Sequence, residues 1–295
     1  MVSKIRVLGG TPLRGEVTVR GAKNLVPKAM VAALLSAEQS KLRNVPLIRD
    51  VDVVSDLLRM HGATVDYDQE AGVLGITPGS INLPEDPVEM DKLAGSSRIP
   101  ILFAGPLLHN LGEAFIPDLG GCHIGSRPVN FHLRVLEDFG ARRIQEAAGM
   151  HLIAEKPLKA KPVHLPYPSV GATEQTLLTA VMAQGITELT NAAVEPEIMD
   201  LIAILQKMGA IISVDTDRTI RIEGVDKLRG YSHTALPDRI EAGSWACAAL
   251  ATGGDVFVRG AEQQSMTSFL NVFRKVGGEF DVQDEGIRFW NPGGE

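Results

Sequence analysis

The feature that most constrains the fold of this chain is an internal repeat of about 70 residues. An amphipathic helix, a glycine followed by a small residue, and two short alternating strands recur four times. The glycines are Gly62, Gly140, Gly209 and Gly277, which are 78, 69 and 68 residues apart. Each stands where the end of a helix requires a residue in the left-handed conformation. The chain is therefore predicted to consist of copies of one supersecondary unit.

The other half of each repeat is a helix rich in Ala and Leu, with a polar start and a strand after it. Its copies span residues 23–35, 98–108, 169–182 and 238–250. The complete unit is then helix, strand, helix, strand, strand, preceded by a leading strand. This order predicts an α/β fold of the α+β type, in which mixed sheets carry helices on one side.

The repeats also predict the domain organisation. Three units fill residues 23–235, which we expect to form one complete domain, while residues 1–22 and 236–295 form an incomplete second domain. The N-terminal strands Ile5–Val7 and Glu16–Val19 are expected to pair within that second domain. By the repeat period, roughly two further units, on the order of 140 residues, would be needed to complete it.

Charge and composition narrow the classes of partner. Lys and Arg number 29 against 36 Asp and Glu, a net charge of −7, and no basic run follows a nucleic-acid backbone. We therefore expect no nucleic acid as partner, although a small anion can still bind a local group of cations. The longest apolar run, residues 99–108, contains two prolines and is too short to span a bilayer. Cys122 and Cys247 form no disulfide framework, so a cytoplasmic location without a membrane partner is predicted.

A glycine-rich segment, residues 119–128, contains the first cysteine. Gly120, Gly121 and Gly125 surround Cys122, and Arg127 follows five residues later. Glycines permit close approach of a ligand to the backbone, and a thiol near a fixed cation ionises more easily. The pattern favours a reactive loop, and the alternative is a buried structural cysteine.

Polar residues gather at the starts of the Ala-rich helices. Lys23 and Arg98 occupy equivalent places in two repeats, and Ser169 with Gly171 begins a third helix. If the repeats are related by rotation, these helix starts converge and offer positive charge and free N–H groups to an anion. The alternatives are ordinary solvated cations and a serine that only caps its helix. The seven histidines lack metal-ligand spacing, so no metal is expected.

Five motifs together resemble a known family. They are Gly-Ala-Lys-Asn at 21–24, the cysteine segment at 120–128, Ser-Val-Gly-Ala-Thr at 169–173, Glu-Pro-Glu at 195–197 and Leu-Pro-Asp-Arg-Ile-Glu at 236–241. Along the whole chain the sequence is similar to the UDP-N-acetylglucosamine 1-carboxyvinyltransferases, a branch of the enolpyruvyl transferases. The resemblance implies an inside-out α/β barrel of two domains with three repeats each. It also implies transfer of the enolpyruvyl group of phosphoenolpyruvate to the 3-hydroxyl of UDP-N-acetylglucosamine, with release of phosphate and without a cofactor, in the first committed step of peptidoglycan synthesis.

The resemblance also implies roles for individual residues. Cys122 would protonate the methylene carbon of phosphoenolpyruvate and be the target of fosfomycin, and Lys23 and Arg127 would act with it in catalysis. The implied substrate-binding residues are Lys23, Asn24, Arg49, Arg98, Arg127, Pro128, Val129, Asn130, Phe131, Ser169, Val170 and Gly171. Among these, Lys23, Arg127 and Arg49 would hold phosphoenolpyruvate. Arg98 would lie near its phosphate and the sugar diphosphate, and Asn24 would contact the sugar. Residues 127–131 would bind uridine, and residues 169–171 the diphosphate.

Some positions depart from the family pattern. Tyr167 stands where a lysine is frequent and Asn130 where an aspartate is frequent. In the family, the missing segment supplies the base for the sugar hydroxyl, so the 295-residue chain alone is expected to be inactive and to self-associate through its incomplete domain. Two other functions remain open: a non-catalytic protein that binds nucleotide sugars, and a transferase of the shikimate type.

Overall fold

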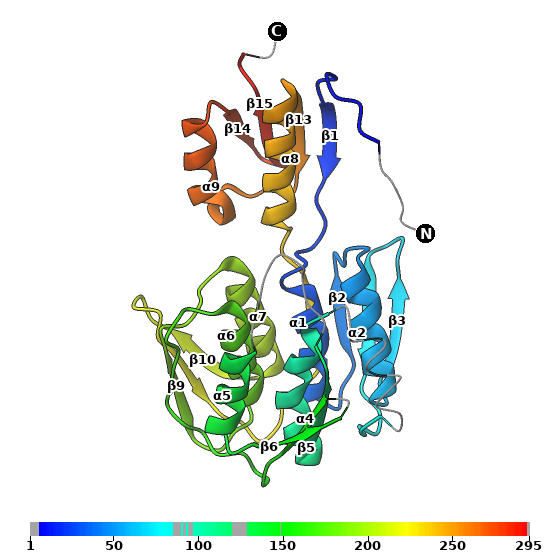
Figure 1. Cartoon of the computed structure of the whole chain (residues 1–295), viewed down its shortest axis with the longest axis vertical. Helices are drawn as coiled ribbons and strands as arrows, with labels where there is room; N and C mark the ends of the chain where they lie inside the picture. The colour runs from blue at the N-terminus through cyan, green and yellow to red at the C-terminus, as the bar shows by residue number, and fades with distance from the viewer. Residues whose placement is uncertain are drawn as a thin grey trace. The chain divides into compact units, whose positions relative to one another are not determined.

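The computed structural model describes residues 6–84, 90, 93, 97–119, 129–147 and 149–293. The chain forms two compact units. We call Lys23–Leu236 the large unit, and Met1–Ala22 with Pro237–Glu295 the small unit (Figure 1).

Three sheets form the outside of the large unit. Their strand orders are β12-β2-β4-β3, β5-β7-β6 and β10-β11-β9-β8. The strands are β2 (Ser40–Arg43), β3 (Thr64–Asp68), β4 (Val73–Thr77), β5 (Glu113–Pro117), β6 (Arg142–Glu146), β7 (Gly149–Ile153), β8 (Val163–His164), β9 (Ile186–Thr190), β10 (Ile211–Val214), β11 (Ile220–Glu223) and β12 (Ser232–Thr234). The pairs β12–β2 and β8–β9 are parallel, and the other pairs are antiparallel. The last strand of the large unit, β12, pairs with its first strand, β2, and so completes the first sheet.

Helices make up the rest of the large unit. They are α1 (Val26–Ala32), η1 (Ala33–Leu35), α2 (Arg49–Met60), η2 (Ile99–Phe103), α4 (Ala104–Leu111), α5 (Asn130–Asp138), α6 (Val170–Ala180) and α7 (Pro196–Met208). All seven residues of α1 are buried, and so are residues 172–180 of α6. In Figure 1, β9 and β10 lie on one side of this unit, and β2 and β3 on the opposite side. A helix buried all round must lie in a core, so α1 and α6 form the inside of this unit, whereas α2 and α5 also carry exposed residues.

The glycine repeat has the conformational role that its spacing predicts. Gly62, Gly140, Gly209 and Gly277 all have a positive φ, between 90° and 107°, at or just after the end of a helix. A side chain there would meet the following carbonyl group, which is why glycine recurs.

One predicted helix differs from expectation. Residues 98–108 were expected to be one α-helix, but they form the 3-10 helix η2 followed by α4, which extends to Leu111. Pro106 has no N–H, and its ring clashes with the carbonyl group four residues earlier, at Leu102. A regular α-helix therefore cannot continue unbroken through this segment.

The small unit contains one copy of the repeat. Its sheet has the order β1-β13-β15-β14, and helices α8 (Arg239–Thr252) and α9 (Gln263–Lys275) belong to it. The strands are β1 (Arg14–Thr18), β13 (Asp255–Arg259), β14 (Glu279–Gln283) and β15 (Gly286–Trp290). Its core includes Val258, Phe273 and Phe289.

The N-terminal segment joins this unit through β1. It runs parallel to β13, which confirms the expected pairing of Glu16–Val19, and Arg259 Nε lies 2.6 Å from Glu16 Oε1 across the pair. The other expected strand, Ile5–Val7, is wrong in its described part, because Arg6 and Val7 lie outside any strand and are exposed. Alternation of polar and apolar residues alone does not hold a segment in a sheet without a neighbouring strand.

Candidate functional site

The predicted cation Lys23 lies just before α1 and contacts the start of α2. Its Nζ is 3.1 Å from Asp50 Oδ2, and its side chain is 63% exposed. Asp50 belongs to the first turn of α2, where a negative charge is favoured by the helix dipole. The preceding Arg49 is the first residue of that helix and is exposed. The starts of α1 and α2 are thus joined at a place open to solvent.

The same carboxylate reaches a third helix. Ser97 Oγ donates to Asp50 Oδ1 at 3.2 Å and accepts a hydrogen bond from the N–H of Ile99 at 3.3 Å. Ser97 is buried, and Arg98 occupies the position that caps η2. The segment that carries Arg98 is therefore tied to the segment that carries Lys23.

The start of α6 has the predicted cap. Ser169 Oγ accepts from the N–H of Ala172 at 3.3 Å, and Ser169 O accepts from Thr173 Oγ1 at 2.9 Å. Ser169, Val170 and Gly171 are partly exposed, whereas the next nine residues are buried. Only the first turn of α6 can therefore meet a ligand, and its helix N–H groups are the donors that it offers.

A histidine not included among the predicted site residues covers this helix start. A Cβ at Gly171 would lie 2.6 Å from His132 Nε2, so the imidazole ring of α5 rests directly on the backbone of α6 (helix–helix contact). Its Nδ1 lies 3.3 Å from Gln175 Oε1. The pKa of His132 is lowered to about 4, mainly by burial and also by the positive charges of Arg98 and Lys28, while the hydrogen bond with Gln175 opposes the shift. The ring is therefore neutral near pH 7. The sequence gives no local signal for this contact, because His132 and Gly171 lie far apart in the chain and meet only when α5 packs against α6.

A buried ion pair supports the helix starts from below. Lys28 Nζ of α1 lies 3.5 Å from Glu174 Oε1 of α6 and donates to Asn24 O at 2.8 Å. Both side chains are at most 10% exposed. Burial raises the pKa of Glu174 to about 7, opposed by Lys28 and reinforced by Glu197 and Glu195. The predicted sugar contact Asn24 thus lies in a loop whose backbone is held by a lysine from the core.

The remaining predicted residues divide into two groups. Val129, Asn130 and Phe131 form the start of α5, with Val129 as its cap and Asn130 exposed. Cys122, Arg127 and Pro128 lie outside the described residues, as does the rest of 120–128. The structure therefore links Lys23 to Ser97 and the start of η2, and brings His132 against the start of α6. The roles given to the cysteine segment stay predictions.

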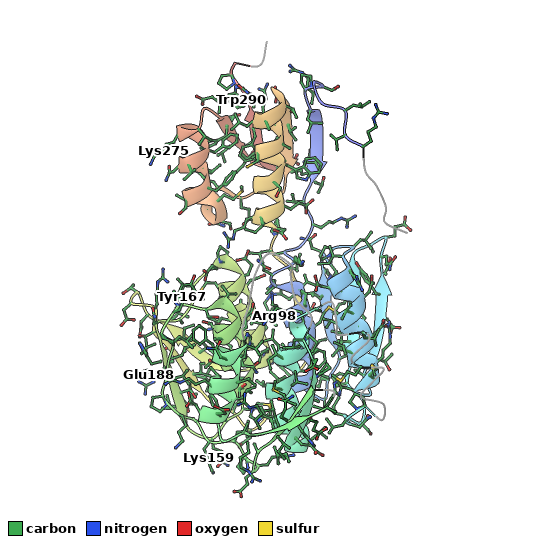
Figure 2. All side chains as sticks on the ribbon, in the orientation of Figure 1. Arg98, Lys159, Tyr167, Glu188, Lys275 and Trp290 are labelled. Carbon is green, nitrogen blue, oxygen red and sulfur yellow. The ribbon has the colours of Figure 1, made fainter. Side chains whose placement is uncertain are left out.

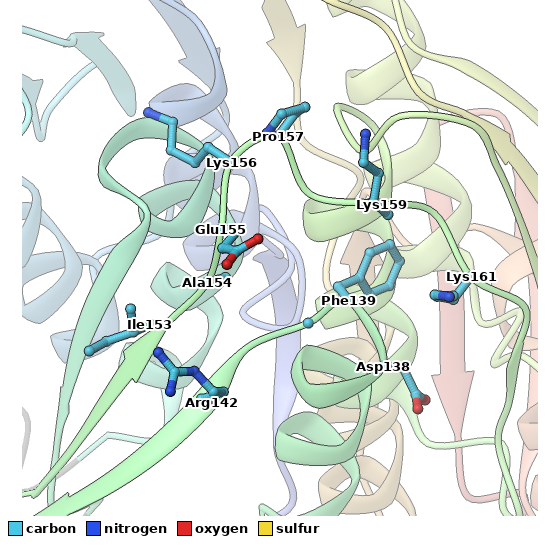
Figure 3. Close-up of a pocket in the computed structure, with 11 residues that line it drawn as sticks. Asp138, Phe139, Arg142, Ile153, Ala154, Glu155, Lys156, Pro157, Lys159 and Lys161 are labelled. Atoms are coloured by element: carbon cyan, nitrogen blue, oxygen red, sulfur yellow. The ribbon is translucent and has the colours of Figure 1, made fainter.

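A large pocket among the described residues lies elsewhere. It has a volume of about 610 Å³ and opens at the end of α5 (Figure 3). It is lined by Asp138, Phe139, Gly140, Arg142, Ile153, Ala154, Glu155, Lys156, Pro157, Lys159 and Lys161. None of these residues was predicted for the site, and the pocket is separated from Asn130 by the length of α5, about 13 Å. Two of its lysines already bind the protein, Lys156 to Asn110 O and Lys159 to Gln184 Oε1.

Two features are absent from the described part of the chain. No group of three or more His, Cys, Asp or Glu residues there could hold a metal ion. None of the described helices has the length and apolar character needed to cross a membrane. Figure 2 shows two residues at positions discussed above, Arg98 and the 64% exposed Tyr167 that precedes α6.

Curated relatives match nearly the whole chain. A UDP-N-acetylglucosamine 1-carboxyvinyltransferase of Protochlamydia amoebophila (strain UWE25) is 45% identical over 98% of this chain and 63% of its own length. That of Staphylococcus aureus (strain N315), named UDP-N-acetylglucosamine 1-carboxyvinyltransferase 1, is 40% identical over 97% of this chain and 68% of its own length. The chain thus spans less than two thirds of the first of these relatives.

Solved structures show the same fold at low sequence identity. The enolpyruvyl transferase NikO from Streptomyces tendae superposes with a TM-score of 0.84 at 21% identity, over 97% of this chain and 67% of that one. An EPSP synthase from Acinetobacter baumannii superposes with a TM-score of 0.75 at 17% identity, over 97% of this chain and 66% of that one. The family model described as EPSP synthase (3-phosphoshikimate 1-carboxyvinyltransferase) matches residues 7–292. The repeats and the three-sheet unit agree with these matches. The chain belongs to the EPSP synthase family of enolpyruvyl transferases.

Proposed function

We propose that this chain takes part in the transfer of the enolpyruvyl group from phosphoenolpyruvate to the 3-hydroxyl of UDP-N-acetylglucosamine, with release of phosphate, in the cytoplasm. The observation that carries the proposal is the 45% identity to a transferase of that name across 98% of this chain. The helix starts give it physical support, because two anionic substrates require cations and N–H dipoles in one region. Lys23, Arg98 and the first turn of α6 provide such groups within the large unit.

The proposed reaction is an addition followed by an elimination. The sugar hydroxyl gives its proton to a base that no residue of this chain is assigned, and its oxygen bonds to C2 of phosphoenolpyruvate while C3 takes a proton from Cys122, which gives a tetrahedral ketal and a Cys122 thiolate. The methyl group then returns a proton to that thiolate and the C2–O bond to phosphate breaks, so the double bond re-forms and phosphate leaves. Lys23, with Arg49 and Arg127, would neutralise the phosphoenolpyruvate charges, and Arg98 would lie between its phosphate and the sugar diphosphate. Groups fixed in advance around developing charge lower the barrier most effectively.

Binding of the nucleotide sugar would use the other helix starts. Ser169, Val170 and Gly171 would bind the diphosphate through the free N–H groups of α6, and Asn24 would contact the sugar. Pro128, Val129, Asn130 and Phe131 would bind uridine at the start of α5. His132 is neutral and in contact with Gly171, so it can donate or accept a hydrogen bond there without adding charge.

Phosphate release from phosphoenolpyruvate and UDP-N-acetylglucosamine tests the proposal. Because the 295-residue chain alone is expected to be inactive, we expect it to bind the nucleotide sugar without releasing phosphate. Any release that does occur should be abolished by Cys122→Ser and left intact by Cys247→Ser, the matched change at the exposed thiol of α8. If the chain binds the nucleotide sugar in calorimetry but releases no phosphate, it contributes a binding site and turnover requires further residues or a second copy. Absence of both binding and turnover would contradict the proposal.

Two other functions would give different results in the same assay. A non-catalytic binding protein would bind the nucleotide sugar, and Cys122→Ser would change neither binding nor any reaction with phosphoenolpyruvate. A shikimate-type transferase would accept shikimate 3-phosphate as the enolpyruvyl acceptor in competition with UDP-N-acetylglucosamine. Self-association of the chain, which we also propose, would appear as a mass that rises with concentration in light scattering.

A further inference from the structure

One carboxylate joins three helix starts at the proposed site. Asp50 Oδ2 is 3.1 Å from Lys23 Nζ, and Asp50 Oδ1 accepts from Ser97 Oγ at 3.2 Å. Ser97 in turn accepts from the N–H of Ile99, the first residue of η2. Asp50 itself is fixed in the first turn of α2. Each oxygen of this carboxylate therefore positions a different segment, and each segment carries one predicted substrate-binding cation.

The exposure of the two partners shows what this contact leaves available. The Lys23 side chain is 63% exposed, whereas that of Asp50 is 23% exposed. An ammonium group has three donors, and the exposure of the Lys23 side chain lets a ligand reach it from solvent. A free lysine side chain has many rotamers, and a partner that restricts them reduces the entropy lost when the ligand binds.

We propose that Asp50 is a positioning residue that holds Lys23 and the start of η2, next to Arg98. In this position both cations can bind one small anion that carries a phosphate and a carboxylate group. The inference rests on the proposed function, because it takes phosphoenolpyruvate as the ligand. Asp50 does not contact the ligand in this arrangement. It acts through Lys23 on one side and through Ser97 on the other.

The negative charge of Asp50 also has an opposing effect on anion binding. A carboxylate near an anion site also repels the anion, so removing its charge could strengthen binding. Asp52 allows the two effects to be separated, because it is an exposed acid in the same first turn of α2. Asp52→Asn removes the same charge from the same helix dipole. It leaves the contacts of Asp50 with Lys23 and Ser97 in place.

The experiment is calorimetric titration of the 295-residue chain with phosphoenolpyruvate. We expect Asp50→Asn to weaken binding about tenfold, while Asp52→Asn changes it by less than about twofold. Ser97→Ala removes only the η2 arm and is expected to weaken binding by about threefold. Asp50→Glu keeps the charge and should recover part of the loss. Thermal unfolding of each variant shows whether its fold is retained.

Each result decides between the alternatives. If Asp50→Asn binds as tightly as Asp52→Asn, or more tightly than the unchanged protein, the positioning role is wrong while the proposed function stands. If Ser97→Ala loses as much affinity as Asp50→Asn, Asp50 acts only by holding η2, and the role assigned to its contact with Lys23 is wrong. Failure of the unchanged protein to bind phosphoenolpyruvate would overturn the positioning role. The proposed function would fall with it only if nucleotide-sugar binding and phosphate release were absent as well.

Discussion

At the scale of single residues, the candidate site depends on a close approach that glycine permits. The His132 ring rests on Gly171, where a Cβ would lie 2.6 Å from Nε2 and 2.9 Å from Cε1. Real contacts of a Cβ are longer than this, and the ring is partly enclosed, so it has to move if a side chain is added. The neutral imidazole can therefore lie against the backbone at the start of α6 only because Gly171 has no Cβ.

Gly171→Ala tests this arrangement. We expect it to displace the His132 ring and to weaken binding of UDP-N-acetylglucosamine about tenfold or more, measured by calorimetry. The matched control is Gly75→Ala in β4, where the nearest atom to a new Cβ is a side-chain nitrogen at 3.7 Å, an ordinary contact. Unchanged affinity in Gly171→Ala would show that neither the ring nor this helix start contributes to nucleotide-sugar binding.

At the scale of the elements, a buried ion pair joins the two most enclosed helices. Lys28 of α1 and Glu174 of α6 are both buried, and the pKa of Glu174 is raised to about 7 because burial disfavours its charge. In the unfolded chain this carboxyl has its ordinary pKa, near 4.5. The folded state therefore binds the proton more tightly, and the contribution of Glu174 to stability falls as pH rises from about 4.5 to about 7.

Lys28→Met should consequently destabilise the protein in a pH-dependent way. At pH 8 Glu174 is charged and loses its partner, and we expect a cost of about 3 kcal/mol in the free energy of unfolding. At pH 5 Glu174 is protonated, so removal of the buried ammonium should cost less than about 1 kcal/mol. Urea unfolding at both pH values measures the difference.

The double variant Lys28→Met with Glu174→Met is the control for that prediction. It removes both charges at similar volume, so the loss seen at pH 8 should largely disappear. An equal loss at both pH values in Lys28→Met would mean that packing of the lysine stem, and not the charge of Glu174, determines its effect. That result would contradict the assigned role of the pair.

The elements also show which parts of the fold the sequence could reveal. The helix ends at Gly62, Gly140, Gly209 and Gly277 and the cap at Ser169 were predictable, because capping is local chemistry. The contact of Lys28 with Glu174 was not, since these residues are 146 positions apart and meet only through the packing of two helices in one core. The link from Asp50 to Ser97 was missed for the same reason. Local patterns predict elements, whereas contacts between elements depend on the packing of the whole unit.

At the scale of the whole molecule, equivalent helices have different surroundings in the two units. In α6 of the large unit, residues 172–180 are all buried. In α8 of the small unit, Ala242, Ala246 and Ala249 are buried, while Ile240, Ser244, Cys247 and Ala251 are exposed. These four exposed residues recur at a helical spacing, so they form one face. A helix packed on one side only gains less apolar burial than one enclosed on all sides.

Hydrogen exchange should therefore distinguish the two helices. We expect the amides of α8 to exchange about a hundredfold faster than those of α6, because local opening of a half-packed helix costs less free energy. Strand β13 is the control within the small unit: if it exchanges more slowly than α8, then α8 opens locally and the unit does not unfold as a whole.

A parallel measurement follows the reaction of the Cys247 thiol with a disulfide reagent. Slower exchange and slower thiol reaction at higher protein concentration would show that the exposed face of α8 is covered by self-association. Equal protection of α6 and α8 in a dilute monomer would contradict the prediction, since it would mean that the exposed face carries no cost in stability.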